Sequence, residues 1–395
     1  MAPQRTGRHT PDPAPLSPAR PHFPAPAATA AGTRRYAERF ERALAADFYR
    51  RLAAPSGDAG LTVASLGLGT YLGASHDEDD ARYEEAILRA LAAGSNLLDT
   101  AINYRCQRSE RAVGRALARA IADGVVRRDE VVVCTKGGFV PLDGEPPPTR
   151  AAYDAYLERE FFARGVMTAA DVAHGGHSLA PSFLRDQVAR SRANLGVETI
   201  DVYYLHNPEQ QLDVLAPDAF RAALRGAFET LEACVARGVV ARYGVATWRA
   251  LRVAPGARGH LALAELVAVA REVAGDAHHL AAVQLPVSLA MPEAVREPTQ
   301  RLAGVRPTAR RPATLLQAAH DLGLGVVASA PLMQGQLARG LAAPLRGALP
   351  AGETDAQRAL EFVRRMPGVT AALVGMRSVE HVDENLRAAA AAATV

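Results

Sequence analysis

Four side chains suited to acid–base chemistry stand at the ends of three short apolar segments. Asp99 and Tyr104 follow the first segment, Lys136 ends the second and His206 ends the third. A free phenol has a pKa of about 10 and is a poor acid near neutral pH, but a nearby ammonium favours ionisation. The pattern therefore indicates Tyr104 as a proton donor whose pKa is lowered by Lys136. Asp99 would hold the ammonium, and His206 would bind the oxygen that receives the proton.

Lys136 has a second distinguishing property. It is the only lysine among the 45 lysine and arginine residues of the chain. Arginine cannot replace a compact ammonium with a readily shifted pKa, so a site that needs such a group keeps its lysine. Chance survival of a single lysine is the alternative. A buried ammonium and carboxylate are costly unless they are paired, which explains why Asp99 and Lys136 occur together.

A repeating strand–helix pattern must position these groups. Strand-like runs recur at 65–68, 96–98, 131–135, 200–205, 241–245, 281–285, 325–328 and 371–374. Helical stretches follow them at 81–93, 109–122, 181–195, 219–236, 261–273, 313–322, 355–365 and 379–392. Eight such units with continuous apolar strands predict an α/β fold, a (β/α)8 TIM barrel, whose active site lies at the C-terminal ends of the strands. A doubly wound sheet is the alternative.

The remaining segments predict three additions to this barrel. Residues 1–33 are rich in Pro, Ala and Arg without periodicity, so we expect a disordered leader that folding does not need. Residues 34–60 are expected to form an N-terminal helical extension, with a helix over 34–53, and the barrel is expected over 61–395. A long insertion at 139–180 follows the third strand, where connections usually take about two to six residues. Its aromatic cluster predicts a lid over the active site, and a helical subdomain on the barrel flank is the alternative.

The composition argues against several classes of protein. Three cysteines are too few and too scattered for a disulfide framework or a zinc site, which favours a reduced, cytoplasmic setting. No apolar run approaches the about 18 residues of a membrane span. The net charge of +3 is concentrated in residues 1–55, so the body of the chain offers no basic face for nucleic acid. His174 and His177 lack a third ligand nearby, so no metal is expected.

The four groups, together with further motifs, resemble the aldo-keto reductase family. Their spacing resembles its catalytic tetrad, and Gly67-Leu-Gly-Thr-Tyr71 resembles its first strand. Val283-Gln284 resembles the strand 6 glutamine that binds the nicotinamide carboxamide. Gly375-Met-Arg-Ser378, followed by Asp383-Glu-Asn385, resembles the signature for the adenosine end of NADP(H). The resemblance covers residues 61–390, nearly the whole chain that is expected to be ordered.

This resemblance implies an oxidoreductase that moves a hydride between NADP(H), preferred over NAD(H), and a small aldehyde, ketone or sugar-type carbonyl or alcohol. Arg377 would bind the 2′-phosphate, because a guanidinium fork matches phosphate oxygens. The resemblance places these residues at the cofactor: Gly69, Thr70, Tyr71, Asp99, Gln284, Ser329, Pro331, Leu332, Gly375, Arg377, Ser378, His381, Glu384 and Asn385.

The chain departs from the family pattern around the nicotinamide. Many members place a Ser-Asn pair after strand 5, where this chain has Ala246-Thr247, and an aromatic ring after strand 7, where it has none. His381 stands where an arginine is common. Tyr71 and Trp248 are candidates for a substitute face, with packing as the alternative.

Two other functions stay open at this point. One is a catalytically weak NADP(H)-sensing or partner-binding barrel, which the missing nicotinamide contacts favour. The other is an unrelated barrel lyase or isomerase, which the motif around residues 375–385 argues against. The fold alone does not decide among these functions, because barrels host many chemistries. The sequence indicates neither the substrate nor the oligomeric state.

Overall fold

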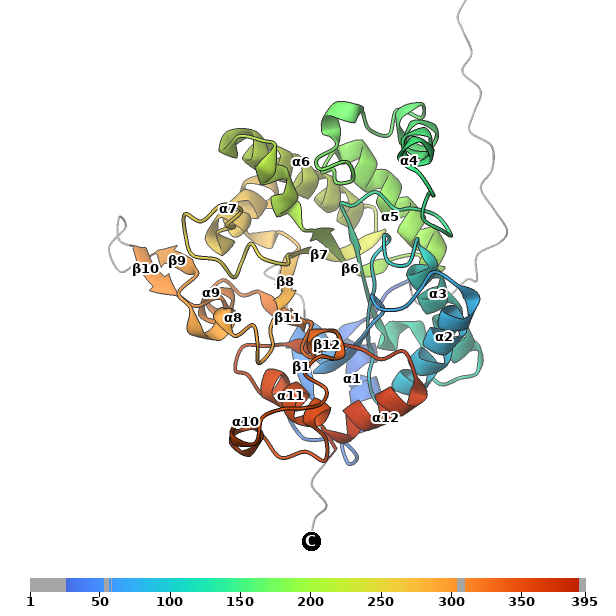
Figure 1. Ribbon diagram of the computed structural model, residues 1–395, viewed down its shortest axis with the longest axis vertical. Coiled ribbons are helices and arrows are strands. Elements are labelled where there is room, and N and C mark those ends of the chain that lie inside the picture. The colour runs from blue at the N-terminus through green and yellow to red at the C-terminus, as the bar shows by residue number, and fades with distance from the viewer. Residues whose placement is uncertain (1–25, 53–56, 58, 304–309, 391–395) are drawn as a thin grey trace, which may run out of the picture.

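The computed structural model describes residues 26–52, 57, 59–303 and 310–390. Its centre is a closed barrel of parallel strands in the order β11-β12-β3-β4-β5-β6-β7-β8, which Figure 1 shows surrounded by helices. The predicted (β/α)8 barrel is confirmed, and the doubly wound alternative is wrong because the sheet closes between β8 and β11. The barrel strands are β3 (Leu66–Gly69), β4 (Leu97–Asp99), β5 (Val132–Gly137), β6 (Ile200–His206), β7 (Val240–Ala246), β8 (Leu280–Pro286), β11 (Gly325–Ser329) and β12 (Ala371–Gly375).

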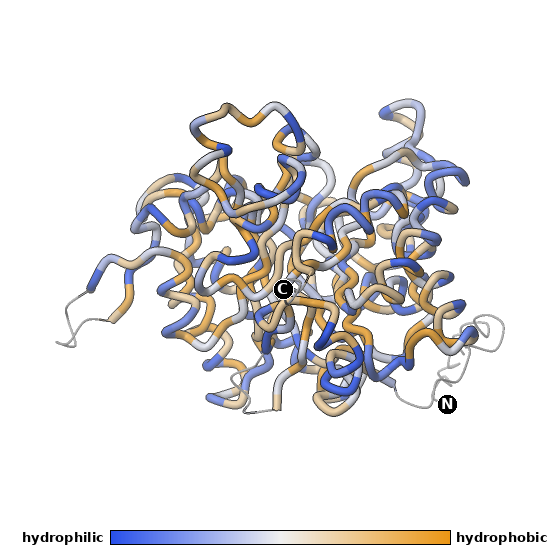
Figure 2. The backbone as a smooth tube through the Cα atoms, turned by 90° about the horizontal axis from the view of Figure 1, so that it is seen from below, coloured by the Kyte–Doolittle hydropathy of each residue, from blue (hydrophilic) through white to orange (hydrophobic). Residues whose placement is uncertain are grey.

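Amphipathic helices cover the outside of the barrel. Each has one apolar face on the strands, which is why orange and blue segments alternate along the helices in Figure 2. Their ends follow the capping signals: α5 and α6 begin at a proline, and α5 ends at the left-handed Gly196. The covering helices are α2 (Asp77–Ala92), α3 (Arg108–Ala122), α5 (Pro181–Leu195), α6 (Pro217–Ala236), α7 (Leu263–Ala274), α9 (Leu315–Asp321), α11 (Asp355–Arg364) and α12 (Val379–Arg387).

Smaller elements complete the described chain. An antiparallel hairpin of β9 and β10 precedes α9 and was not predicted. Residues 304–309, between its strands, lie outside the described part of the chain. Within the described residues, none of the helices combines the length and the apolar character that a bilayer-spanning segment needs. The smaller elements are α1 (Ala30–Glu38), β1 (Tyr49–Leu52), β2 (Leu61–Ala64), α4 (Arg150–Leu157), α8 (Glu293–Arg296), β9 (Gln300–Ala303), β10 (Arg310–Ala313) and α10 (Ala343–Ala348).

The N-terminal segment closes the bottom of the barrel. β1 and β2 form an antiparallel hairpin whose Leu52 and Leu61 pack among residues of the strand N-termini, such as Leu97 and Val132. The helix predicted over 34–53 is therefore wrong in its bounds, because α1 ends at Glu38 and β1 follows. The apolar residues that suggested this helix are mostly buried in the main core, so their spacing predicted burial but not conformation.

The last residues of the predicted leader are ordered, which corrects that prediction for 26–33; residues 1–25 lie outside the described part. The Ala28 amide donates to Asp201 Oδ1 over 2.7 Å, and the Thr29 hydroxyl caps α1. Thr33 is buried, and its hydroxyl accepts a hydrogen bond from the Thr62 amide at 3.0 Å. Residues 26–33 thus belong to the folded barrel.

A truncation beginning at Arg34 is expected to be less stable than one beginning at Pro26. The first loses a hydrogen bond to the buried Asp201 carboxylate, a type worth about 1.5–3 kcal/mol, together with the helix cap. Thermal unfolding of the two proteins measures the difference, which should be a melting temperature lower by several degrees for the shorter chain. Equal melting temperatures would show that residues 26–33 contribute no stability.

The insertion at 139–180 packs on the flank of the barrel. Its apolar side chains, including Tyr156, Leu157 and Phe161, are buried together against Phe183 of α5, and Figure 1 places α4 beside α5. The lid prediction is wrong for this aromatic cluster, and the helical subdomain that was the alternative describes it correctly. The residues carry enough apolar surface for a small core of their own, so their spacing could not distinguish the two arrangements.

Candidate active site

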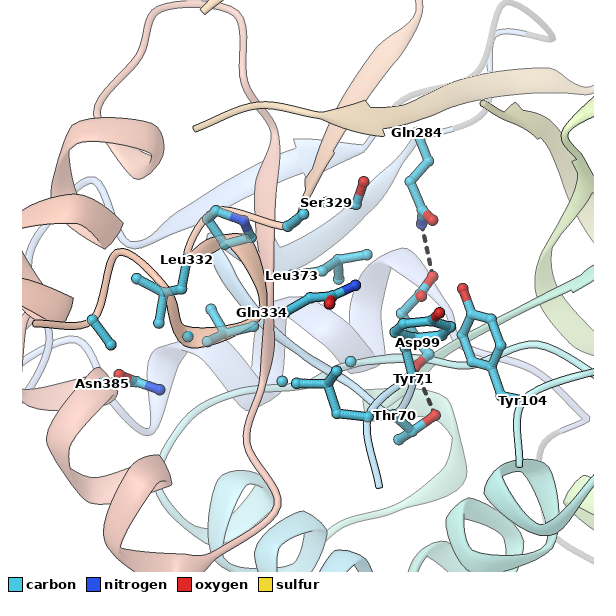
Figure 3. Close-up of a pocket in the computed structure, with 18 of the residues that line it drawn as sticks. Thr70, Tyr71, Asp99, Tyr104, Gln284, Ser329, Leu332, Gln334, Leu373 and Asn385 are labelled. Atoms are coloured by element: carbon cyan, nitrogen blue, oxygen red, sulfur yellow. Dashed lines mark hydrogen bonds between the residues drawn. The ribbon is translucent and has the colours of Figure 1, made fainter. Parts of the chain in front are cut away.

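A long cavity of about 1000 Å³ opens where the barrel strands end. Its walls include the last residues of most strands, among them Asp99 and His206, together with Gln284 near the end of β8. The opposite end is formed by residues of α11 and α12, so Tyr104 and Asn385 lie on opposite sides of the view in Figure 3. The cavity thus connects the predicted catalytic residues with the predicted adenosine site.

Asp99 and Lys136 form a buried ion pair behind this wall. Lys136 Nζ lies 2.5 Å from Asp99 Oδ1, and the side chains are 1% and 6% exposed. Lys136 Nζ also donates to the Thr100 carbonyl at 2.8 Å, and Gln284 Nε2 donates to Asp99 Oδ2 at 2.8 Å, as Figure 3 shows. Each oxygen of the carboxylate therefore accepts a hydrogen bond, Oδ1 from Lys136 and Oδ2 from Gln284.

The ammonium of this pair stays charged despite its burial. Burial lowers the pKa of Lys136, but the neighbouring Asp99 and Tyr104 outweigh it, so the net shift is upward. Burial raises the pKa of Asp99, and the lowering effect of Lys136 and of the two hydrogen bonds does not overcome it. Lys136 is thus an ammonium at neutral pH, held in place by the carboxylate.

Tyr104 lies next to this ammonium. Lys136 Nζ is 4.9 Å from the centre of the Tyr104 ring, and the ring packs edge-on against Tyr71 at 5.1 Å. Burial raises the pKa of Tyr104, and the lowering effect of Lys136 does not overcome it. Lys136 thus lowers this pKa as predicted, but burial, which the prediction did not include, has the larger effect. The consequence is a phenol that keeps its proton at neutral pH and can donate it.

A left-handed turn holds Tyr104 in position. The next three residues, Arg105, Cys106 and Gln107, have φ of 49°, 53° and 66°, which is strained for side chains other than glycine. Their partners enforce this conformation: Arg105 Nε donates to the Ala74 carbonyl at 2.7 Å, and its guanidinium pairs with Asp80. The strain is thus located directly after Tyr104, where it sets the direction of the chain.

His206 ends β6 with its ring facing Tyr104. The two ring centres are 5.8 Å apart, and Phe139 packs edge-on against the imidazole at 5.0 Å. Burial lowers the pKa of His206 well below its ordinary value, and Lys136 and His177 lower it further. The imidazole is therefore neutral. Its Nδ1 has no hydrogen-bond partner among the described residues, so the ring has hydrogen-bonding capacity to spare.

Most of the residues predicted to bind the cofactor line this cavity, and three predicted site residues do not. Lys136 lies behind Asp99. Arg377 forms an ion pair with the buried Asp79, Nη1 to Oδ2 at 3.0 Å, and the hydroxyl of Ser378 caps α12. The predicted residues that line the cavity are Gly69, Thr70, Tyr71, Asp99, Tyr104, His206, Gln284, Ser329, Pro331, Leu332, Gly375, His381, Glu384 and Asn385.

Sequence reasoning missed several lining residues. Phe139, Asn103 and Thr247 follow strand ends, a position that signals a barrel site even without a motif. Trp248 was only a candidate, and it lines the cavity with half of its surface exposed. Arg339 lies in the loop after β11 and has neither a hydrogen bond nor an ion pair within the described part of the chain. Nothing in its local sequence distinguished it from a surface arginine.

The cavity suits a nicotinamide dinucleotide in its volume and in the polar atoms that line it. Its volume is at the upper end of the about 300–1000 Å³ typical of ligand sites, as a long ligand requires. Two buried oxygen atoms at the catalytic end, Asn103 Oδ1 and Thr247 Oγ1, have no partner among the described residues. Arg339 adds a positive charge to the cavity wall, which a phosphate group could bind.

The sequence is similar to known enzymes over much of the barrel. The sequence model of the Aldo/keto reductase family matches residues 65–342, more than half of the chain. An NADH-specific methylglyoxal reductase of Escherichia coli (strain K12) is 30% identical over 158 residues, which cover 38% of this chain and 40% of that protein. A D-threo-aldose 1-dehydrogenase of a Pseudomonas species is 31% identical over 194 residues, which cover 47% of this chain and 51% of that protein. The matches span about half or less of these relatives.

Solved structures share the fold along nearly their whole length. An aldo-keto reductase of Bacillus halodurans in its holo form matches with a TM-score of 0.56 at 20% identity, covering 88% of this chain and 92% of that one. An aldo-keto reductase of Klebsiella pneumoniae in complex with NADPH matches with a TM-score of 0.53 at 21% identity, covering 86% and 89%. With the family's sequence model matched over most of the barrel, this chain belongs to the aldo/keto reductase family.

Proposed function

We propose that this chain is a nicotinamide-dependent oxidoreductase that interconverts a small aldehyde, ketone or sugar-type carbonyl with its alcohol. The observation that carries the proposal is the buried Asp99–Lys136 pair beside Tyr104, at the wall of a cavity long enough for a dinucleotide. Family membership supports the class of reaction. The names of the two relatives, a methylglyoxal reductase and an aldose dehydrogenase, support the substrate class.

The chain's own residues would manage the proton and the charge in this reaction. The dinucleotide, when bound, supplies or accepts the hydride. Tyr104 donates its proton to the carbonyl oxygen, and Lys136 stabilises the phenolate that remains. Asp99 keeps Lys136 charged and oriented through the 2.5 Å contact. The neutral imidazole of His206 orients the carbonyl oxygen by a hydrogen bond. Gln284, Ser329 and Asn385 are among the residues that would hold the dinucleotide.

Binding and turnover measurements test this function directly. Titration of the protein with NADPH and with NADH, followed by protein or nucleotide fluorescence, should show saturable binding. A panel of small aldehydes, ketones and sugars should then include compounds that are reduced, or whose alcohols are oxidised, at the expense of the bound dinucleotide. Saturable binding of neither dinucleotide would contradict the proposal.

One observation favours a second function, that of a catalytically weak NADP(H)-sensing or partner-binding barrel. β11 ends in Ser329, followed by Ala330, so no aromatic ring enters the cavity from this strand end. Aromatic stacking contributes about 0.5–1.5 kcal/mol beyond buried area, and its loss would weaken nicotinamide binding. Tight binding of NADPH without turnover of any compound in the panel would support this second function.

We also propose that NADP(H) is preferred over NAD(H), with Arg377 and Ser378 at the 2′-phosphate. Arg377→Ala should then weaken NADPH binding by about tenfold or more, since a charge-assisted contact is worth about 1.5–3 kcal/mol, and should change NADH binding little. Asp79→Asn is the matched variant: it removes the charge that pairs with Arg377 at 3.0 Å and should strengthen NADPH binding. Fluorescence titration of both variants checks this. Equal losses for both dinucleotides in Arg377→Ala would exclude a contact with the 2′-phosphate.

A further inference from the structure

His177 links the flank insertion to the strand that carries His206. Its side chain is buried, and its Nε2 lies 2.8 Å from the main-chain carbonyl oxygen of His206. Phe139 packs edge-on between the two histidines, with both ring centres 5.0 Å from its own. Phe139 lines the cavity, whereas His177 does not. His177 is thus one layer behind the wall of the active site.

The protonation of His177 is defined by its partners. Gln211 Nε2 lies 2.9 Å from Nδ1 of the ring and donates to the His177 carbonyl at 3.0 Å. An amide nitrogen can only donate, so Nδ1 accepts and the ring proton is on Nε2, which donates to the His206 carbonyl. Burial lowers the pKa of His177 to about 4, so the ring remains neutral at ordinary pH. The hydrogen bond therefore has one direction, and the His177 ring has one tautomer.

The backbone around His177 is shaped to deliver this bond. The segment 173–177 forms a tight turn in which His174 and Gly175 have φ of 49° and 71°. Ser178 N then donates to the Gly138 carbonyl at 2.8 Å, which fixes the turn to the end of β5. A Cβ at Gly138 would lie 2.9 Å from both His177 Nε2 and the His206 oxygen. A side chain there would therefore crowd the two atoms of the bond, which only glycine leaves free.

The His206 carbonyl is at the point where β6 leaves the barrel. The next residue, Asn207, has φ of 48°, and its amide donates to the Ala246 carbonyl at 2.6 Å. The peptide bond after His206 is therefore held on both sides: its N–H bonds to the end of β7, and its carbonyl oxygen accepts the hydrogen bond of the His177 ring. The buried donor completes the fixing of this peptide plane, and with it the backbone that directs the His206 ring.

We propose that His177 is a positioning residue for His206, so that the insertion at 139–180 serves the reaction by holding the end of β6 in place. The proposal rests on the proposed function for its effect on turnover. The insertion therefore acts from behind the active site, through one hydrogen bond and the packing of Phe139. The other histidine of the turn, His174, is exposed and pairs with Asp213, so it has no part in this arrangement.

Two substitutions separate the hydrogen bond from the shape of the ring. His177→Ala removes the donor, whereas His177→Gln places an amide donor near the position of Nε2. Displacement of a catalytic group by about 1 Å can reduce turnover by up to about 100-fold. We expect kcat for a good carbonyl substrate to fall about 10- to 100-fold in His177→Ala, with the affinity for NADPH unchanged, and to recover to within a few-fold of wild type in His177→Gln. His174→Ala is the matched control and should behave as wild type.

A second measurement of the role of His177 does not depend on turnover. In protein labelled with 13C-histidine, the Cε1–H resonance of His206, assigned with His206→Gln, reports the ring's orientation against Phe139. This resonance should shift or broaden in His177→Ala and return to its wild-type position and width in His177→Gln. An unchanged resonance in His177→Ala, or equal shifts in the Ala and Gln variants, would overturn the proposal. If His177→Ala did not fold, turnover and the His206 resonance would be measured on Gln211→Leu, which removes the hydrogen-bond partner of Nδ1, and these measurements would decide. Absence of any turnover in the wild type would contradict the proposed function alone, because the resonance would still decide the role of His177.

Discussion

Replacing Tyr104 with phenylalanine is expected to lower kcat for carbonyl reduction by at least about 100-fold, the scale of a lost general acid. The substitution keeps the ring that packs against Tyr71 and His206 and removes only the hydroxyl. The affinity for NADPH should therefore change little. Steady-state kinetics with the best substrate of the panel, together with nucleotide titration, measure both effects. Tyr49→Phe is a matched control, because its hydroxyl bonds to the Gly94 carbonyl at the bottom of the barrel.

Lys136→Met should produce a loss of similar size for a different reason. The ammonium is 4.9 Å from the centre of the Tyr104 ring. In the proposed reaction it would stabilise the phenolate that proton donation leaves behind. Its removal also leaves the buried Asp99 without its counter-charge, which destabilises the site further. Lys136→Arg should not restore activity, because a planar guanidinium does not fit the place of a compact ammonium. Turnover of Lys136→Met close to wild type would contradict the assignment of the donor.

The pH dependence of the reduction gives a further check on Tyr104. Burial raises the pKa of this phenol above its ordinary value, so the acid form is present at every pH below about 10. The rate of carbonyl reduction at low substrate concentration should therefore show no alkaline decline caused by Tyr104 between pH 7 and about 9. A decline in this range that was absent from Tyr104→Phe would indicate a phenol that ionises near neutral pH.

Local sequence patterns carried most of the information about the barrel and the catalytic end of its cavity. Apolar runs and glycine stops are local signals, so the eight strands and their helices could be placed, and α5 was placed with both ends correct. The C-terminal ends of parallel strands meet on one side of a barrel, so Asp99, Lys136 and His206 had to converge. Residue type then limited the chemistry that could be proposed, and the single lysine drew attention to position 136.

Contacts between distant segments could not be predicted in the same way. Asp79 and Arg377 are separated by nearly 300 residues, and no local pattern announces their ion pair. The pKa of Tyr104 depends on how deeply the barrel buries it, which residue types alone do not state. The aromatic cluster of the insertion and the apolar residues before β1 signalled burial correctly. They gave no indication of the surface against which that burial occurs.

The buried ion pair at the bottom of the barrel leads to the largest expected effect on stability. Arg128 Nη2 and Asp201 Oδ2 are 2.8 Å apart, and both side chains are fully buried. Asp201 also accepts hydrogen bonds from the amides of Val133 and Ala28, at 2.8 and 2.7 Å, so one carboxylate joins β5, β6 and the segment before α1. Arg128 in turn donates to the carbonyls of Val131 and Thr199. The two side chains therefore connect the N-terminal segment to the start of the barrel.

Asp201→Asn is expected to lower the free energy of unfolding by about 3–5 kcal/mol, because it leaves the Arg128 guanidinium buried without a counter-charge. Urea unfolding of the variant and the wild type measures this change. The double variant Arg128→Met, Asp201→Asn removes the stranded charge as well and should be more stable than Asp201→Asn alone, even though both have lost the pair. The site lies at the end of the barrel opposite the cavity, so kcat at a temperature where the variant is folded should stay close to wild type. A double variant no more stable than Asp201→Asn would show that the hydrogen bonds to the carboxylate, and not its charge, hold this end of the barrel together.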